Sequence, residues 1–148
     1  MYPILVIVFG VFLTTAGAVV QEQVRAKQVV SLSGDVAAVN FLTYRASVAR
    51  YFNTNSPSGT IADASLSWPT GYVRDLRWAN VIVAGTLYVY TTVPADPGML
   101  QKVHERTGKY VMVGTKTPAG NLISIGGMTI ITSLPGAIPV GALVYVGG

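Results

Sequence analysis

The pattern of apolar positions begins with an unbroken run over residues 1–20, in which no side chain carries a charge. In a helix, about 20 residues rise ~30 Å, which is the thickness of the hydrocarbon core of a membrane. The run therefore predicts a transmembrane anchor over residues 1–20. The remaining residues, 21–148, are enough to bury one modest core, and we expect them to form a single domain.

Cleavage of this run is the alternative to a retained anchor. Ala16-Gly17-Ala18 has the small-x-small form that a signal peptidase accepts, but signal peptides usually open with a basic residue and none precedes Arg25. The length of the run and its uncharged start favour the anchor over a signal peptide. A prepilin leader would be cut after Gly10, and prepilins carry Glu at the fifth position after the cut, where this chain has Thr15. A prepilin leader is therefore excluded.

Residues 21–52 contain no proline and a single glycine, and they predict a helix that continues from the anchor. Apolar residues recur in it at alternating spacings of four and three, which places them on one helix face. This apolar stripe consists of Ala37, Phe41, Tyr44, Val48 and Tyr51. We expect the apolar stripe to pack against the domain's own core. Ser33-Gly34-Asp35 predicts a kink or a restart of the helix, and Val39 and Leu42 leave a second, partner-facing surface open.

A cluster of turn-forming residues over 53–59 ends the predicted helix. After it, β-branched and aromatic residues predict short strands. These strands cover residues 81–83, 86–90, 110–113, 122–125, 129–131 and 143–146. Ala84-Gly85 marks a hairpin or a bulge, and Gly126-Gly127 marks a turn.

A second helix is predicted within the series of strands, over residues 96–107. Asp96 caps its start and Gly108 stops it. The fold class that follows is α+β with a pilin-like plan. In this plan a transmembrane helix continues into an amphipathic helix, and the amphipathic helix packs on a small antiparallel β-sheet.

Few charges accompany this pattern. Charged residues make up 11% of the chain, and the net charge at neutral pH is +4. The basic residues are scattered rather than clustered, which argues against nucleic acid as a partner. Arg25 and Lys27 follow the anchor and mildly favour a cytoplasmic domain. The chain has no cysteine, so it forms neither a disulfide framework nor a reactive thiol.

Residues suited to catalysis are scarce. His104 is the only histidine, and its neighbour Glu105 would project about 100° away from it on a helix, so the pair does not form a metal site. The chain has no Gly-x-Ser-x-Gly elbow, and its only glutamates are Glu22 and Glu105. We therefore expect no enzymatic activity, no catalytic, metal-binding or cofactor-binding residue, no cofactor and no small-molecule substrate.

A family resemblance rests on a longer set of residues. Residues 42–51 read Leu-Thr-Tyr-Arg-Ala-Ser-Val-Ala-Arg-Tyr, and they are followed by Asn55, Gly59, Asp63, Leu66 and Pro69. Residues 134–146 read Leu-Pro-Gly-Ala-Ile-Pro-Val-Gly-Ala-Leu-Val-Tyr-Val. Together these residues resemble the PilM family of the type IVB pilus, the thin pilus of conjugative plasmids. An unrelated actin-like protein of type IVA systems shares that name and binds nucleotide, whereas this chain has no phosphate-binding glycine motif.

The resemblance implies a non-enzymatic, single-pass component of the bacterial inner membrane, belonging to the basal body or to the pilin transport machinery. It implies a periplasmic C-terminal domain, against the hint from Arg25 and Lys27. The implied partners are other pilus assembly proteins of the inner membrane, pilin, and membrane lipid through residues 1–20. The alternative is a pilin-like or pseudopilin subunit that enters the filament or primes it.

The resemblance transfers no catalytic residue, but it draws attention to one helix face as an interaction or structural surface. That face consists of Phe41, Tyr44, Arg45, Val48 and Tyr51. Arg45 matches the family's Tyr-Arg pair, and we expect its stem to pack while its head reaches a carboxylate or a backbone carbonyl. A structural ion pair is favoured over a partner contact. Tyr44 and Tyr51 are expected as core aromatics with hydroxyls in water.

Overall fold

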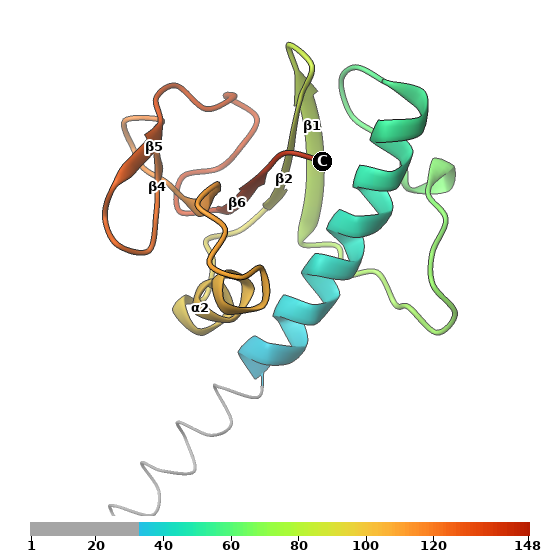
Figure 1. The fold of residues 1–148 in the computed structure, drawn as a ribbon, viewed down its shortest axis with the longest axis horizontal. Helices are drawn as coiled ribbons and strands as arrows, with labels where there is room; N and C mark the ends of the chain where they lie inside the picture. Colours follow the sequence, from blue (N-terminus) through green and yellow to red (C-terminus); the bar gives the residue numbers. More distant parts are fainter. Residues whose placement is uncertain (1–32) are drawn as a thin grey trace, which may run out of the picture. The chain divides into compact units, whose positions relative to one another are not determined.

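The structure, a computed structural model, describes residues 33–148 and places a long helix beside an antiparallel sheet (Figure 1). This arrangement confirms the α+β class. The anchor expected over residues 1–20 and the start of the helix expected from residue 21 lie outside the described residues. Among the residues described, no helix combines the length and the apolar character needed to cross a membrane.

The long helix covers residues 33–55 and ends later than the residue 52 expected from the sequence. Its last turn is extended by polar side chains that bond to helix carbonyls. Thr54 donates its hydroxyl to Arg50 O (2.9 Å), and Asn55 Nδ2 donates to Tyr51 O (3.0 Å). Ser56 follows with φ of 46°, a left-handed conformation that closes the helix end. The first turn-forming residues, 53–55, therefore belong to the last turn of the helix instead of following its end.

Six strands form one sheet in the order β1-β2-β6-β3-β4-β5, and every neighbouring pair is antiparallel. The strands are β1 (Trp78–Val83), β2 (Thr86–Thr91), β3 (Val113–Lys116), β4 (Leu122–Ile123), β5 (Thr129–Ile131) and β6 (Leu143–Val146). A short 3-10 helix, η1 (Asp63–Ser65), precedes them. β6 lies between β2 and β3, so the last strand along the chain joins the two halves of the sheet.

The turn between β1 and β2 is a tight hairpin, as one reading of Ala84-Gly85 predicted. Ala84 (φ 50°) and Gly85 (φ 74°) both have positive φ angles, which suits the twist of a two-residue hairpin. β4 is shorter than the residues 122–125 expected. Ser124 already belongs to the next turn, because its carbonyl accepts a hydrogen bond from Gly127 N (2.9 Å).

The prediction for β3 was wrong, since the strand covers Val113–Lys116 and not residues 110–113. The sequence did not indicate this strand, because neither Gly114 nor Lys116 is a residue type typical of a buried sheet. A Cβ atom at Gly114 would overlap the carbonyl oxygen of Ile123 in β4, so only glycine allows the two strands to pair there. Lys116 is buried, and its ammonium donates to Pro135 O (2.9 Å) and Ile138 O (2.8 Å).

The second helix, α2 (Pro97–Arg106), agrees with the sequence prediction. Asp96 caps it, with Oδ1 accepting hydrogen bonds from Gly98 N (2.7 Å) and Met99 N (3.4 Å). α2 also explains Gly34, which the sequence marked as a kink or restart. Gly34 is helical, and a Cβ atom there would lie 3.0 Å from the Gly98 carbonyl carbon. The glycine therefore permits close approach of the two helices.

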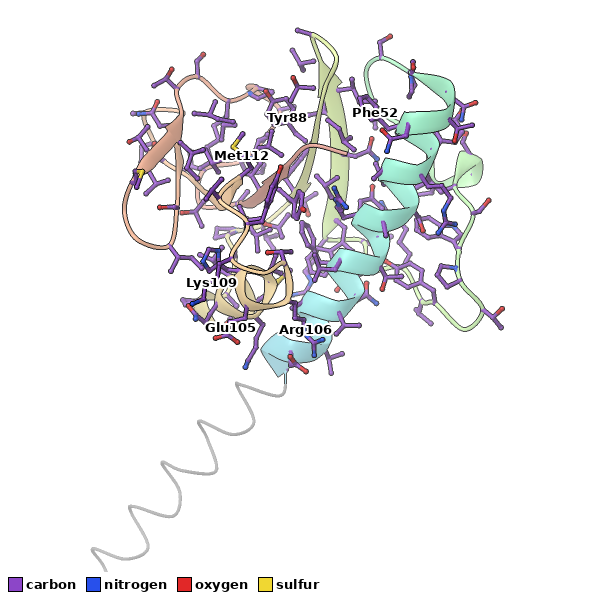
Figure 2. The ribbon with its side chains drawn as sticks, in the orientation of Figure 1. Phe52, Tyr88, Glu105, Arg106, Lys109 and Met112 are labelled. Atoms are coloured by element: carbon purple, nitrogen blue, oxygen red, sulfur yellow. The ribbon has the colours of Figure 1, made fainter. Side chains whose placement is uncertain are left out.

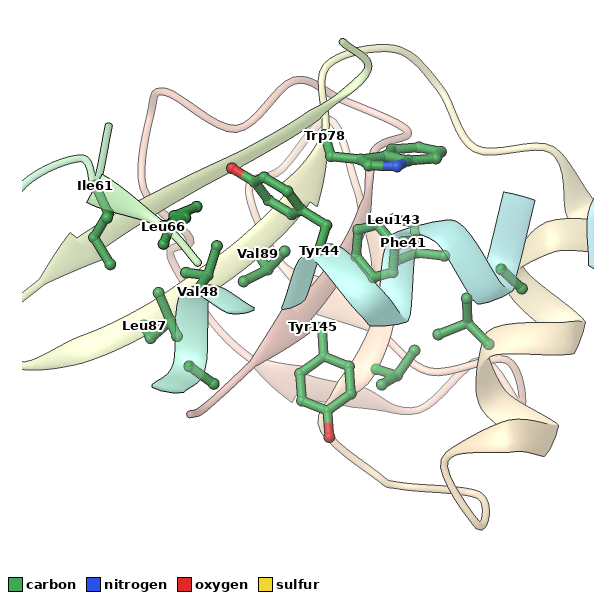
Figure 3. Close-up of a cluster of buried hydrophobic side chains, with 14 of the residues drawn as sticks. Phe41, Tyr44, Val48, Ile61, Leu66, Trp78, Leu87, Val89, Leu143 and Tyr145 are labelled. Carbon is green, nitrogen blue, oxygen red and sulfur yellow. The ribbon is translucent and has the colours of Figure 1, made fainter. Parts of the chain in front are cut away.

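Most of the buried side chains lie between the long helix, α2 and one face of the sheet (Figure 3). Phe41 packs edge-on against Trp78, with ring centroids 5.4 Å apart. β6 contributes to both faces of the sheet, because Leu143 and Tyr145 join this core while Val144 and Val146 join a second cluster under the loop of residues 134–142. All four residues of β6 are buried.

Candidate functional site

The helix face predicted from the sequence is turned toward the sheet. Phe41 and Val48 are fully buried, Tyr44 is 1% exposed, and Tyr51 is half-buried against the same core (Figure 3). The long helix is held in place by this face. Burial leaves Phe41, Tyr44 and Val48 little surface for a partner.

The hydroxyl of Tyr44 is bonded within the protein, and the expectation that it reaches water was wrong. It accepts a hydrogen bond from Asn80 Nδ2 (2.9 Å), and burial raises the pKa of Tyr44. Asn80 also donates to Ile61 O (3.0 Å) and accepts from Ile61 N (2.8 Å). This buried side chain of β1 therefore joins the long helix and the segment before η1 to the edge of the sheet.

Arg45 reaches a backbone carbonyl, which was one of its expected partners. Its guanidinium lies over the ring of Tyr145, 4.4 Å from the centroid, and Nη2 donates to Gly147 O (3.3 Å). The ion pairs found among residues 33–148 involve other basic side chains. The ion pair that the sequence favoured for Arg45 is not among them. A cation–π contact and one hydrogen bond hold Arg45 in position.

The opposite edge of the same helix borders an open groove of about 370 Å³. Its walls are the beginning of the long helix and the loop of residues 71–73. The lining residues are Asp35, Val36, Val39, Asn40, Thr43, Gly71, Tyr72 and Val73. The exposed fractions of Val36 (70%), Val39 (44%) and Val73 (78%) are large for apolar residues. The groove is therefore an apolar surface that the described residues leave uncovered.

Asn40 fixes the shape of the groove. Its Oδ1 accepts hydrogen bonds from Trp78 Nε1 (2.7 Å) and from the Tyr72 hydroxyl (3.0 Å), and its Nδ2 donates to Val73 O (2.9 Å). Burial raises the pKa of Tyr72 to about 12, so the hydroxyl stays protonated near neutral pH. The loop is thus fastened to the helix by hydrogen bonds within the chain, and these fix the shape of the groove.

Among the described residues that line the groove, Asp35 is the only charged one, and its charge is matched within the chain. Its carboxylate pairs with Arg106 of α2 at 2.9 Å. Figure 2 shows Arg106 beside the beginning of the long helix. The hydrogen bond from Arg106 lowers the pKa of Asp35 below its ordinary value. The groove consequently offers apolar contact with no unbalanced charge, which suits another protein surface.

Groups suited to catalysis do not converge in the part of the chain that the structure describes. No three acidic or histidine side chains approach one another closely enough to hold a metal ion in residues 33–148. Glu105 accepts hydrogen bonds from Gln101 (2.8 Å) and Lys102 (3.2 Å), and these lower its pKa. A smaller hollow of about 180 Å³ near Arg50 is lined by hydroxyl and amide groups, without an acid or a histidine.

The sequence predicted residues of only one wall of the groove. Val39 was noted as lying outside the apolar stripe, which is correct, whereas Leu42 packs partly against the core. The other wall, with Tyr72 and Val73, was missed. It depends on hydrogen bonds between Asn40 and residues more than thirty positions away, and no local pattern in the sequence encodes them.

The chain is similar to known proteins in both sequence and fold. The family model described as PilM matches residues 8–146, which is almost the whole chain. A solved structure described as protein PilM from Escherichia coli B7A is similar in fold, with a TM-score of 0.63 and 18% sequence identity. The similarity covers 78% of this chain and 92% of that one. A search among proteins with curated descriptions found no match.

Proposed function

The chain belongs to the PilM family, and from this premise we propose that it is a non-enzymatic component of a type IVB, or conjugative thin-pilus, biogenesis apparatus. In this proposal, residues 1–20 anchor it in the bacterial inner membrane and the domain of residues 21–148 lies in the periplasm. It acts by binding other assembly proteins of the basal body or of the pilin transport machinery, and pilin is a further partner in this proposal.

The observation that carries the proposal is the family match over residues 8–146. The geometry supports a binding role, because an apolar groove stands open beside the long helix. Exposed apolar patches of this kind mark surfaces that bind other proteins, membranes or ligands.

The alternative is a pilin-like or pseudopilin subunit that enters the filament or primes it. A long helix packed on an antiparallel sheet is the general plan of such subunits, and fold alone does not separate the two roles. Processing and location separate them. An assembly component keeps its N-terminal segment and stays with the inner membrane, whereas a processed subunit is cut and is recovered with the fibres.

The experiment removes the gene from a cell that makes thin pili and restores it with a tagged copy. We expect the deletion to abolish thin pili, and the restored protein to fractionate with the inner membrane at its uncut mass. A reporter fused to the C-terminus should be active in the periplasm. Recovery of the protein in sheared pili, with an N-terminus at Val11, would establish the alternative instead. Normal piliation of the deletion strain would refute both roles.

A pair of substitutions tests which helix face supports assembly. Phe41→Asp should unfold the domain, because it buries a charge at a fully buried position with no partner. Val39→Asp is the matched control on the same helix, and it should leave folding intact because this side chain is 44% exposed. A Phe41→Asp variant that stays folded but fails to assemble pili would show that the buried face binds a partner.

A further inference from the structure

The second half of the long helix borders a polar hollow of about 180 Å³. The helix residues in its lining come from successive turns, at spacings of three and four, and therefore share one helix face. The opposite wall is formed by residues 65–67, in the segment that runs beside this part of the helix (Figure 1). The lining, which we call the serine hollow, consists of Ser47, Arg50, Tyr51, Thr54, Asn55, Ser65 and Ser67.

Ser47 is the one buried residue in the described lining of the hollow. It is 3% exposed, and the little surface that it keeps opens into the hollow. The Thr54 hydroxyl bonds to the carbonyl of Arg50 (2.9 Å), whereas the Ser47 hydroxyl bonds to no atom of residues 33–148. Buried polar side chains in folded proteins nearly always have a partner. The Ser47 hydroxyl is therefore available to a group that enters the hollow.

Arg50 is the only charged residue that the described part of the chain contributes to the lining. Its side chain is exposed, and the ion pairs of residues 33–148 do not include it. Asp63, the acid nearest in sequence to the opposite wall, is paired with Arg74 at 2.7 Å. The hollow therefore carries an unbalanced positive charge, which attracts anions.

We propose that the serine hollow is a binding site for a phosphate group. The guanidinium of Arg50 offers a planar fork of N–H donors that matches two phosphate oxygens. Ser47, Ser65 and Ser67 add hydroxyls that can donate to the remaining oxygens. A carboxylate has one oxygen fewer than a phosphate ester and would leave more of these donors unused. The volume of about 180 Å³ accommodates the phosphate together with the first atoms of an attached group.

Packing against the core fixes the opposite wall of the hollow. Leu66 stands between Ser65 and Ser67 in the sequence, and its side chain joins the core at 7% exposure. Trp68 follows and stacks on Tyr44 of the long helix, with ring centroids 5.9 Å apart. These contacts hold the two serines beside the hollow, so binding requires little ordering of the chain.

A phosphate titration of the full-length chain tests the site. The isotope-labelled protein is held in dodecyl maltoside micelles, which contain no phosphate, and sodium phosphate is added near neutral pH. Sodium chloride keeps the ionic strength constant, so that screening does not change during the titration. The amide resonances of Ser47, Arg50, Ser65 and Ser67 should shift and reach a plateau. Resonances that do not shift, or that shift equally when chloride alone is added, would overturn the proposal.

Substitutions separate the hollow from a general attraction of anions to a basic protein. Arg50→Gln should abolish the plateau, and Ser47→Ala should weaken binding several-fold while the helix stays folded, because alanine favours helices. Lys109→Gln is the matched control for charge, since Lys109 is also exposed and is outside the ion pairs of residues 33–148. Ser58→Ala is the control for the hydroxyl, and both controls should bind like the native chain. Thermal unfolding midpoints confirm that each variant is folded. Equal weakening by Arg50→Gln and Lys109→Gln would refute a specific site.

Two further ligands identify the source of the phosphate. Glycerol 3-phosphate is a small phosphate monoester, and binding several-fold tighter than that of inorganic phosphate would assign the hollow to phosphate esters. Equal or weaker binding of the ester would assign it to free phosphate. Sodium acetate tests the other class of anion, and acetate that binds as tightly as phosphate would contradict the assignment. None of these outcomes depends on the proposed function, because each is measured on the purified chain.

Discussion

Replacement of Asn80 by leucine tests how the long helix and the edge of the sheet are held together. Asn80 is 2% exposed and makes three hydrogen bonds, one with the Tyr44 hydroxyl and two with the backbone of Ile61. Leucine has nearly the same size but makes none of these bonds. The substitution leaves the Ile61 N–H, the Ile61 carbonyl and the Tyr44 hydroxyl without their partner in a buried region.

The expected cost follows from those three groups. A buried polar group left without a partner costs about 1–3 kcal/mol, and the apolar gain from leucine offsets part of the sum. Asn80→Leu should therefore lower the free energy of unfolding by about 3–5 kcal/mol, which is a large share of the ~5–15 kcal/mol that holds a typical domain. Tyr44→Phe is the matched comparison. It leaves only one N–H of Asn80 unpaired, and it should cost about 1 kcal/mol.

Urea unfolding of the purified variants, followed by tryptophan fluorescence, measures both costs. Trp78 is a suitable reporter, because it is 1% exposed and packs on Phe41. The variants should differ from the native protein in the unfolding midpoint with little change in slope. The reasoning would be refuted if Asn80→Leu cost no more than Tyr44→Phe, since the bonds to Ile61 would then contribute nothing.

The remaining predictions concern the sheet and the paired carboxylate beside the groove. Gly114→Ala should destabilise the domain by at least about 2 kcal/mol, because its Cβ would overlap the Ile123 carbonyl; Gly136→Ala has open space and should change the midpoint of thermal unfolding little. Arg106 donates hydrogen bonds to Asp35, and these hold the pKa of Asp35 below its ordinary value of 3.8. The stability that this pair gives the folded protein is therefore present above pH 3.8 and is lost as the pH falls through the lowered pKa. Asp35→Asn should therefore flatten the acid limb of a stability–pH curve measured at low salt, and a limb of unchanged steepness would contradict the pairing.

Periodicity predicted the parts of the fold that depend on repeated local contacts. The apolar stripe and α2 each contain enough apolar residues at one spacing to show which face is buried, and the apolar run of β6 predicts a strand. The elements that were misplaced contain residues whose burial depends on distant partners. Lys116 is buried because carbonyls of the loop at residues 134–142 accept hydrogen bonds from its ammonium. Asn80, which precedes the strand expected from residue 81, is buried because it forms hydrogen bonds with Ile61 and Tyr44.

The candidate site was less predictable than the fold for the same reason. The partner of Arg45 is the carbonyl of Gly147, 102 residues away, and nothing beside Arg45 in the sequence indicates it. The groove requires both Val39, which the helical spacing exposes, and Val73, which Asn40 holds opposite. A pattern within one helix predicts which residues face outward, but it does not predict which loop will border them.

The central position of β6 constrains the order in which the protein acquires its structure. A chain emerging from the ribosome or passing through a membrane channel delivers β1 to β5 before β6. β2 and β3 each pair with β6 rather than with each other, so the two halves of the sheet have no shared edge until residues 143–146 arrive. Contacts between segments far apart in sequence form slowly. The pairing that joins β1 and β2 to β3, β4 and β5 therefore waits for Leu143–Val146.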